Sequence, residues 1–227
     1  MPTKNSPISI TRQAPAKLNL FLHINGRRVD GYHLLQSVFV RIDWVDTLHF
    51  ELTTDGRITR TDSVNETGRP LPEIDLAVRA AMALQARMGA ALKGNVGAHI
   101  TLEKRIPSEA GMGGGSSDAA TTLLVLNELW QANLPMPELA AIGLALGADV
   151  PFFLYERHAW VEGIGEQITP IELPASLANA RVLVVKPPNG ASTPAVFRSP
   201  DLVRNTKTAT IEGFAAWTES NASQQYL

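Results

Sequence analysis

The sequence contains no cysteine, which excludes disulfide bonds, thiolate metal sites and cysteine nucleophiles. It also lacks any run of about 18 apolar residues, so no segment is expected to span a membrane. The first twelve residues are polar and have no apolar core, which argues against a signal peptide. Together these absences predict a soluble, cytoplasmic protein.

The sequence also has almost no excess of one charge over the other, because its net charge is only −2 over 227 residues. A dedicated nucleic-acid-binding protein would carry a basic face, so this balance argues against that class. With 44% hydrophobic residues, the chain is long enough for one large domain or two small ones. A change of composition at residues 163–174 suggests a first domain at 1–165 and a second at 166–227.

Apolar and polar residues alternate in several segments, as in half-buried strands. The longer predicted strands are at 14–25, 34–52 and 98–106. In the first of them Leu18, Leu20 and Leu22 share one face, and Lys17 lies on the other, outward face. Shorter strands are predicted at 152–154, 159–162 and 181–185, the last of these as a buried strand.

Helical spacing of apolar residues predicts helices at 76–88, 120–130 and 137–146. Gly89 and Gly147 follow the first and the last of them, as glycines that end helices do. The segment 53–73 is rich in Thr, Asp, Gly and Pro and is predicted to be a loop or a ragged hairpin. The mixture of strands and helices predicts an α+β fold.

The stretch GMGGGSSDAA, residues 111–120, is almost pure backbone and stands directly before a predicted helix. Glycine lets a ligand approach the main chain closely, and a helix N-terminus offers unpaired N–H groups and a partial positive charge. This combination predicts an anion site, and phosphate is the commonest biological anion that fits one. Ser116 and Ser117 could cap the helix, and Asp118 would favour its dipole without a catalytic role.

Three known glycine-containing motifs do not match this stretch. No lysine follows the glycines, as a Walker loop requires, and Ser116 stands where a dinucleotide fingerprint needs its third glycine. A nucleophile elbow fails because Asp118 occupies the place of its last glycine. A flexible Gly–Ser linker is the remaining alternative, but a predicted strand and a predicted helix adjoin the stretch and leave few residues for a linker. Nucleotide phosphate is the better hypothesis.

The longer stretch IPSEAGMGGGSSDAA resembles the glycine-rich motif of the GHMP kinases, the superfamily that includes galactokinase, homoserine kinase and mevalonate kinase. APAKLNLFL, DGYHLLQSVF and GADVPFFL extend the resemblance, in order, from Ala14 to about Pro200. Within the superfamily they resemble the kinases that act on a diphosphocytidyl sugar alcohol. The implied fold has two domains: one like domain 2 of ribosomal protein S5, and an incomplete ferredoxin-like one.

The resemblance implies an ATP-dependent kinase that phosphorylates the 2-hydroxyl of diphosphocytidyl methylerythritol, in the non-mevalonate route to isoprenoids. ATP is then expected with Mg²⁺, because ATP carries it; the five histidines suggest no metal site. The resemblance leaves a homodimer open. It assigns nucleotide binding to Pro107, Ser108, Glu109, Ala110, Gly111, Met112, Gly113, Gly114, Gly115, Ser116 and Ser117.

Two residues match the catalytic positions of the family. Asp149 in GADVPFFL matches the catalytic aspartate, which would accept the hydroxyl proton. By pattern alone it is equally a turn residue that binds local N–H groups. Lys17 matches the catalytic lysine, which would keep the carboxylate ionised, although a solvated lysine is the usual alternative. Asn19 is expected to orient these groups.

Aromatic residues match the family's substrate site. Tyr32 and His33 follow a glycine turn, a pair that by itself is more often a packed loop corner. In the family this Gly-Tyr-His segment recognises the cytidine end of the substrate, with Tyr32 stacked on the base. Phe197 matches a second aromatic on the other face of the base, and Thr193 lies in the same segment.

The pattern departs from the family in two places. No Ser-Gly-Ser-Gly motif follows near the C-terminus, and Ile74-Asp75-Leu76 stands where Asn-Leu is usual. A nucleotide-binding but inactive fragment is therefore one alternative function. Another small-molecule GHMP kinase is a second, disfavoured by the Gly-Tyr-His segment. An RNA-binding module is a third, disfavoured by the lack of a basic stripe.

Overall fold

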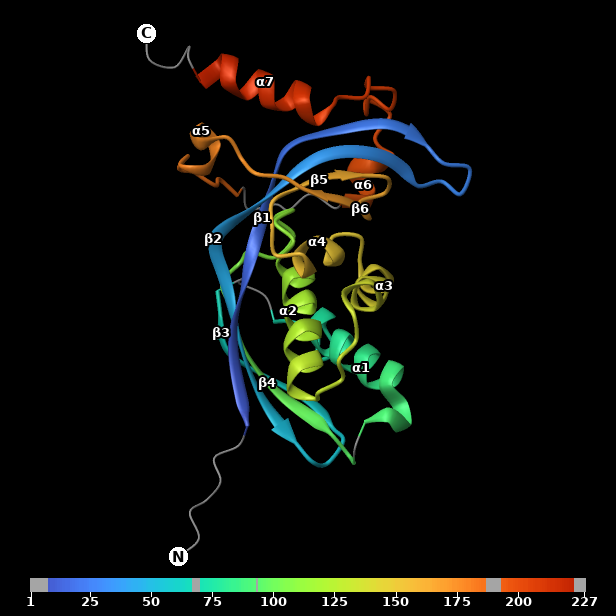
Figure 1. Cartoon of the computed structure of the whole chain (residues 1–227), viewed down its shortest axis with the longest axis vertical. Helices are drawn as coiled ribbons and strands as arrows, with labels where there is room; N and C mark the ends of the chain where they lie inside the picture. Colours follow the sequence, from blue (N-terminus) through green and yellow to red (C-terminus); the bar gives the residue numbers. More distant parts are fainter. Residues whose placement is uncertain (1–7, 67–69, 93, 187–192, 223–227) are drawn as a thin grey trace, which may run out of the picture. The chain divides into compact units, whose positions relative to one another are not determined.

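The computed structural model of the protein describes residues 8–66, 70–92, 94–186 and 193–222 (Figure 1). The described chain divides into two compact units whose segments alternate along the sequence. The first unit takes its residues from 1–17, 42–108 and 112–156, and the second takes them from 18–41, 109–111 and 157–227. The sequence-based boundary at residue 165 stays a prediction.

The sheet of the first unit is built around strand β4 (Gly97–Lys104). The C-terminal half of β2 (His33–Thr53) pairs with it antiparallel, with Thr47 opposite Glu103 and Thr53 opposite Gly97. Strand β3 (Ile58–Asn65) lies on its other edge and is parallel to it. The predicted strand 98–106 is confirmed, and its predicted inward side chains are fully buried: Ile100, Leu102 and Ile106.

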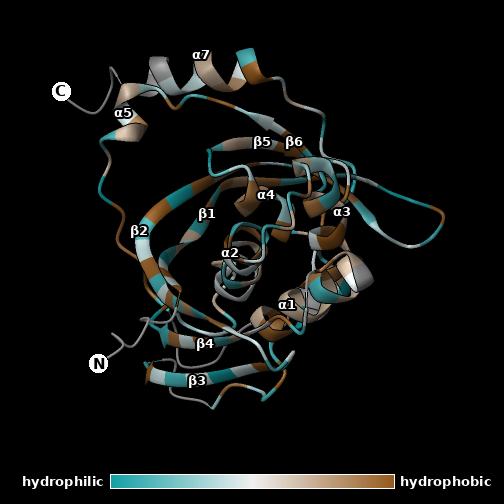
Figure 2. Ribbon diagram, turned by 60° about the horizontal axis from the view of Figure 1, so that its bottom comes forward, coloured by the Kyte–Doolittle hydropathy of each residue, from teal (hydrophilic) through white to brown (hydrophobic). Residues whose placement is uncertain are grey.

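Helices cover one face of this sheet. Helix α1 (Leu76–Met88) begins where the Asp75 carboxylate accepts a hydrogen bond from the Val78 N–H at 3.0 Å, and it ends at Gly89, in the short 3₁₀ helix η1 (Gly89–Ala91). Helix α2 (Gly114–Leu129) packs against α1, and α3 (Met136–Leu146) contacts both. Figure 2 shows α1 and α2 beside each other on the same side of β4. The helices predicted at 76–88 and 137–146 are confirmed, whereas the one predicted at 120–130 is present but begins earlier, at Gly114 within the glycine-rich stretch.

Two local predictions in the first unit are wrong. Residues 152–154, predicted as a strand, belong to the short helix α4 (Val150–Leu154), whose second residue is Pro151. A brief apolar run fits a buried helix as well as a strand, so the pattern could not separate them. The segment 53–73, predicted as a loop or a ragged hairpin, contains β3. Its sequence, ITRTDSVN, does not alternate because this edge strand is largely exposed.

The second unit also contains paired strands. Strand β5 (Ala159–Glu162) pairs antiparallel with the N-terminal half of β2, where Ser37 faces Val161, and with β6 (Gln167–Pro170). Strand β1 (Ser9–Arg27) pairs with β2. The ring of Trp160 is buried against Phe21 and Phe214, with ring centroids 5.5 and 6.3 Å away. The helices of this unit are α5 (Ala175–Ala178), α6 (Thr193–Arg198) and α7 (Ile211–Ala222).

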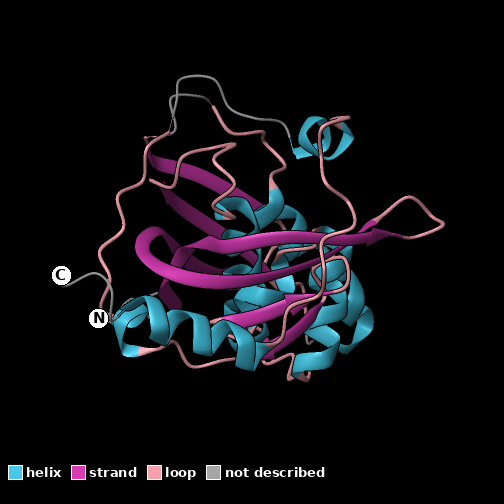
Figure 3. Cartoon of the chain, turned by 90° about the horizontal axis from the view of Figure 1, so that it is seen from above, coloured by secondary structure: helices cyan, strands magenta, loops and turns pink. Residues whose placement is uncertain are grey.

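The buried strand predicted at 181–185 is wrong, because these residues form a loop; Figure 3 draws the loops of the chain in pink and its strands in magenta. Val182, Leu183 and Val185 are exposed, Leu183 to 88%. No strand among the described residues pairs with this segment, and an apolar run without a hydrogen-bonding neighbour has no sheet to enter. In the described ranges, the structure has no helix with both the length and the apolar character needed to cross a membrane.

Candidate active site

The glycine-rich stretch 111–117, which we call the glycine loop, runs into helix α2, whose first residue is Gly114. Gly113 is the residue before the helix and has a left-handed backbone, with φ of 70°. No side chain caps the helix, so the capping role considered for Ser116 and Ser117 is wrong. The hydroxyl oxygen of Ser117 is buried and has no hydrogen-bond partner among the described residues. The first turn therefore keeps N–H groups that no side chain satisfies, together with the positive end of the dipole.

The glycines of the loop serve different purposes. A Cβ on Gly113 would lie 2.9 Å from the Phe153 ring and 3.2 Å from Lys17 Cγ, so a side chain has no room there. A Cβ on Gly114 would meet Ile106 at 2.9 Å and Lys104 Nζ at 3.0 Å. Gly111 also has a positive φ, of 69°, but nothing lies within 4 Å of its missing Cβ. Close packing, and not only access for a ligand, fixes glycine at two of these positions.

Lys17 and Asp149 come together in the first unit. Their Nζ and Oδ2 atoms are 3.4 Å apart, and the Lys17 N–H donates to the carbonyl of Met112 at 2.9 Å. Lys17 thus joins the glycine loop through its backbone and the aspartate through its side chain. Asp149 directly precedes α4 without capping it, and its side chain is about one-third exposed, at 33%.

Lys17 is only 5% exposed, so the prediction that it lies on an outward face is wrong. On the same strand Leu20 and Leu22, predicted to share a face opposite Lys17, are exposed. Alternation shows which residues share a face, but only the packing partners decide which face is buried. A buried lysine beside a carboxylate is more informative than a solvated one, because a buried charge needs a partner.

A second charged group, which sequence reasoning missed, lies under the loop. Lys104 Nζ forms ion pairs with Asp46 and with Asp118, the latter at 2.6 Å, and all three side chains are almost fully buried. The other Asp46 oxygen accepts from the N–H groups of Arg105 and Ile106, at 2.6 and 2.8 Å. We call Asp46, Lys104 and Asp118 the buried triad. It ties the chain just before the loop to the helix that follows it.

The charges of the buried triad shift its pKa values. Burial lowers the pKa of Lys104, but the two carboxylates outweigh burial and raise it above its ordinary value. Burial raises the pKa of Asp118 to about 8, against the lowering effect of Lys104. The second oxygen of Asp118 has no partner among the described residues. The interpretation of Asp118 as a simple dipole residue is therefore wrong.

A signal for the triad was present in the sequence. Lys104 has the same parity as Ile100, Leu102 and Ile106, so the alternation that buries these three side chains also points the lysine inward. Asp46 carries the same signal, because it has the parity of the buried Leu48 and Phe50, but its pairing with Lys104 had none, since the two residues are 58 positions apart.

The aromatic residues that were predicted to bind the cytidine end of the substrate belong to the second unit. The rings of His33 and Phe197 are 5.1 Å apart and tilted by 35°. Tyr32 is 59% exposed, and its N–H donates to Asp30 at 3.3 Å. The Thr193 side chain lies outside the described residues.

The remaining predicted residues are distributed over both units. Asn19, in the second unit, donates through Nδ2 to the Ser37 hydroxyl at 3.1 Å. Pro107, Ser108 and residues 112–117 belong to the first unit, and residues 109–111 to the second. Across the described residues, no group of three or more acidic or histidine side chains could hold a metal ion.

Comparisons with known proteins agree with this geometry. The family model described as the GHMP kinases N terminal domain matches residues 75–157, which include the glycine loop, the helix after it and Asp149. The homoserine kinase of Cytophaga hutchinsonii, 16% identical over 78% of this chain and 56% of its own, shares the fold with a TM-score of 0.56. The chain thus has the fold of the GHMP kinases and matches the model of their N-terminal domain, and the predicted α+β fold is confirmed.

More similar relatives narrow the family. The chain is 65% identical to proteins named 4-diphosphocytidyl-2-C-methyl-D-erythritol kinase from Polaromonas sp. strain JS666, over 89% of this chain and 65% of the relative, and from Polaromonas naphthalenivorans, over 91% and 68%. A crystal structure titled 4-(cytidine 5'-diphospho)-2C-methyl-D-erythritol kinase is 42% identical, with a TM-score of 0.62, over 73% of this chain and 56% of that one. The chain belongs to the 4-diphosphocytidyl-2-C-methyl-D-erythritol kinase family. It spans about two-thirds of the length of these two curated relatives.

Proposed function

We propose that this chain transfers the γ-phosphoryl group of ATP to the 2-hydroxyl of 4-diphosphocytidyl-2-C-methyl-D-erythritol, in the non-mevalonate route to isoprenoids. The observation that carries the proposal is the Lys17–Asp149 pair beside Gly113 of the glycine loop. Relatives that are 56–65% identical and carry the name of this kinase support the choice of substrate.

The glycine loop is proposed to hold the ATP phosphates. The uncapped first turn of α2 offers N–H donors and a partial positive charge, which is what a polyphosphate needs. The backbone of the loop is fixed by the Lys17–Met112 hydrogen bond and by the packing of Gly113 on Phe153. A loop held in this way loses little entropy when a phosphate binds.

Asp149 is proposed as the general base and Lys17 as its partner. The substrate hydroxyl oxygen forms a bond to the γ-phosphorus, its proton passes to an Asp149 oxygen, and the bond from phosphorus to the β-phosphate oxygen breaks to release ADP. The ammonium group of Lys17 lies 3.4 Å from this carboxylate and offsets its negative charge. The same cation stabilises negative charge on the transferring group.

The cytidine end of the substrate is proposed to bind in the second unit. His33 and Phe197 form a partly buried aromatic pair, and Tyr32 offers an exposed ring beside it in sequence. Aromatic side chains hold a base by stacking, which favours flat ligands. Asn19 and Thr193 are proposed as further contacts of this substrate.

Magnesium is proposed to arrive with ATP. A Mg²⁺ ion commonly binds phosphate oxygens, waters and one or two protein oxygens, so it does not need a dedicated cluster of carboxylates.

The test is coupled ATP turnover with the diphosphocytidyl substrate by this chain and by Asp149→Asn. The matched control is Asp43→Asn, which changes an exposed aspartate of the first unit. We expect turnover in the chain and in the control, and its loss in Asp149→Asn. Nucleotide binding without turnover in the unaltered chain would refute the kinase and favour a nucleotide-binding protein. Equal turnover in all three proteins would refute the assignment of Asp149.

A further inference from the structure

Arg204 makes an unusually complete set of contacts for a partly exposed arginine in an irregular segment. Its Nε donates to the Nε2 atom of His33 at 3.2 Å, and its Nη1 donates to the Leu202 carbonyl at 3.0 Å. Its Nη2 donates to the carbonyls of Phe197 and Ser199, at 3.0 and 2.8 Å. The guanidinium therefore joins two of the aromatic residues of the proposed cytidine site, His33 through its ring and Phe197 through its backbone.

The segment that carries this arginine is itself fixed. The N–H of Thr206 donates to the Ile24 carbonyl at 3.0 Å, and the side chain of Asn25 donates back to the Thr206 carbonyl at 3.0 Å. Further along, the side chain of Gln36 both accepts from the N–H of Ala209 and donates to its carbonyl, at 2.9 and 3.2 Å. The segment that carries Arg204 is thus anchored to β1 and β2 by hydrogen bonds on the C-terminal side of the arginine.

The hydrogen bond from Arg204 also determines which ring nitrogen of His33 carries the proton. A guanidinium has only donors, so the Nε2 atom that faces it must accept, and a neutral His33 carries its proton on Nδ1. Loss of hydration, and then the charges of Arg204 and Arg27, lower the pKa of His33. The ring is therefore neutral at pH 7, and its Nδ1–H donor is fixed by its neighbour.

We infer that Arg204 is a positioning residue for cytidine recognition: it fixes the tautomer of His33 and locks the segment of Phe197 against that ring. The inference rests on the proposed function, because it deepens the role of the same site. Arg204 need not touch the substrate. It acts through two residues that are close to each other, with ring centroids 5.1 Å apart.

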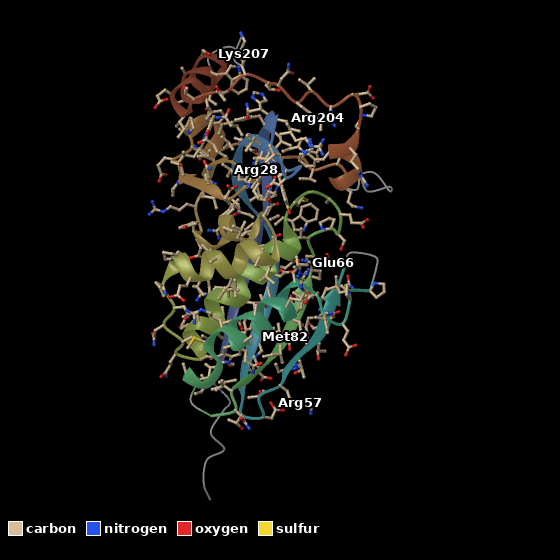
Figure 4. All side chains as sticks on the ribbon, turned by 90° about the vertical axis from the view of Figure 1, so that its right-hand side faces the viewer. Arg28, Arg57, Glu66, Met82, Arg204 and Lys207 are labelled. Carbon is tan, nitrogen blue, oxygen red and sulfur yellow. The ribbon has the colours of Figure 1, made fainter. Side chains whose placement is uncertain are left out.

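The experiment compares the binding of CMP and of ATP, by calorimetry, in the unaltered chain, Arg204→Met and Arg204→Lys. Lys207→Met is the matched control, since Lys207 is an exposed cation of the same segment (Figure 4). We expect CMP to bind about tenfold or more weakly to both Arg204 variants, because a lysine cannot reach all four acceptors. ATP affinity should stay unchanged in every variant, and the control should bind CMP normally.

A spectroscopic measurement gives the second readout. Nitrogen-15 shifts of the imidazole groups, assigned with the help of His33→Gln, should show the Nδ1–H form of His33 in the unaltered chain and a mixture of tautomers in both Arg204 variants. Arg204→Lys keeps the positive charge, so it provides the test if Arg204→Met does not fold. A His33 that carries its proton on Nε2 in the unaltered chain would overturn the inference.

The outcomes separate the inference from the proposed function. If the unaltered chain binds no CMP, the cytidine site fails and the inference fails with it. If the chain binds CMP and the Arg204 variants bind it equally well, the inference alone fails. A parallel loss of CMP and ATP affinity, together with a lower melting temperature, would mean a general structural role and would also overturn it.

Discussion

The two units of the molecule hold their proposed ligand-binding residues by different means. In the first unit, charged side chains lie in the core: the buried triad is almost fully buried, and Lys17 is nearly so. In the second unit, His33, Phe197 and Arg204 are only partly buried, and Arg204 binds mainly backbone carbonyls. Water can replace a lost contact at a partly exposed site, but not in a core, so the first unit should respond to substitution far more strongly.

The largest expected effect concerns the chemistry itself. Lys17→Ala and Asp149→Ala should each lower turnover at least about a hundredfold, the lower end for loss of a general base, while ATP still binds. Turnover at saturating substrate and ATP affinity by calorimetry measure the two quantities separately. Tyr32→Ala tests the other unit in the same assay, and it should raise the KM for the cytidylyl substrate without weakening ATP. Near-normal turnover in either alanine variant of the pair would refute their assignment.

The next effect is on stability. Lys104→Met leaves the Asp46 carboxylate buried without its cation and Asp118 without its hydrogen-bond donor, which should lower the free energy of unfolding by about 3–5 kcal/mol. Urea unfolding followed by circular dichroism measures this change. Lys207→Met, an exposed lysine of the second unit, should change stability by less than about 0.5 kcal/mol. Similar losses in the two variants would contradict the contrast between the units.

The pH dependence of stability should report Asp118. Its pKa is about 8 in the folded chain, so between pH 4 and pH 8 the folded state holds a proton that the unfolded state has released. Its contribution to stability is present at low pH and is lost as pH rises toward 8, by up to about 1.4 kcal/mol per pH unit. Unfolding of the chain and of Asp118→Asn between pH 5 and 8 tests this. The difference between them should change with pH, and parallel curves would refute the shift.

The smallest effect separates two glycines with nearly equal backbone angles. Gly113→Ala and Gly111→Ala both force alanine into a positive φ, at 70° and 69°. Only the first also meets a packed ring, so it should lower stability by about 1–3 kcal/mol more than the second. Thermal unfolding of the two variants side by side measures the difference. An equal loss would mean that Gly113 is required for its backbone angle alone.

Local patterns were enough for the elements with strong periodicity. The helices at 76–88 and 137–146 and the strand at 98–106 were predicted almost to the residue, because each pattern agrees with a capping residue or with its buried face. The errors occur in segments whose pattern of apolar residues does not reveal which other parts of the chain surround them. The exposed run at 181–185, helix α4 and strand β3 depend on which neighbours are present, and sequence periodicity does not contain that information.

The candidate site was predictable to the same extent. Motif resemblance predicted Lys17, Asp149, His33 and Phe197, and the structure brings them together as two close pairs, 3.4 Å between atoms and 5.1 Å between ring centroids. It did not predict the residues that support them. Arg204 is 171 residues from His33 along the chain, so no local pattern could join them.

The sequence by itself determined that a glycine loop precedes a helix, because glycine content and helical spacing are local properties of the chain. It also determined the family, since several motifs occur in one order. Only the tertiary structure decided that Lys17 faces inward, that Lys104 lies between two aspartates, and that Arg204 holds an aromatic pair. The physical reason is that the state of a charge depends on what surrounds it in space, and residues far apart in sequence supply those surroundings.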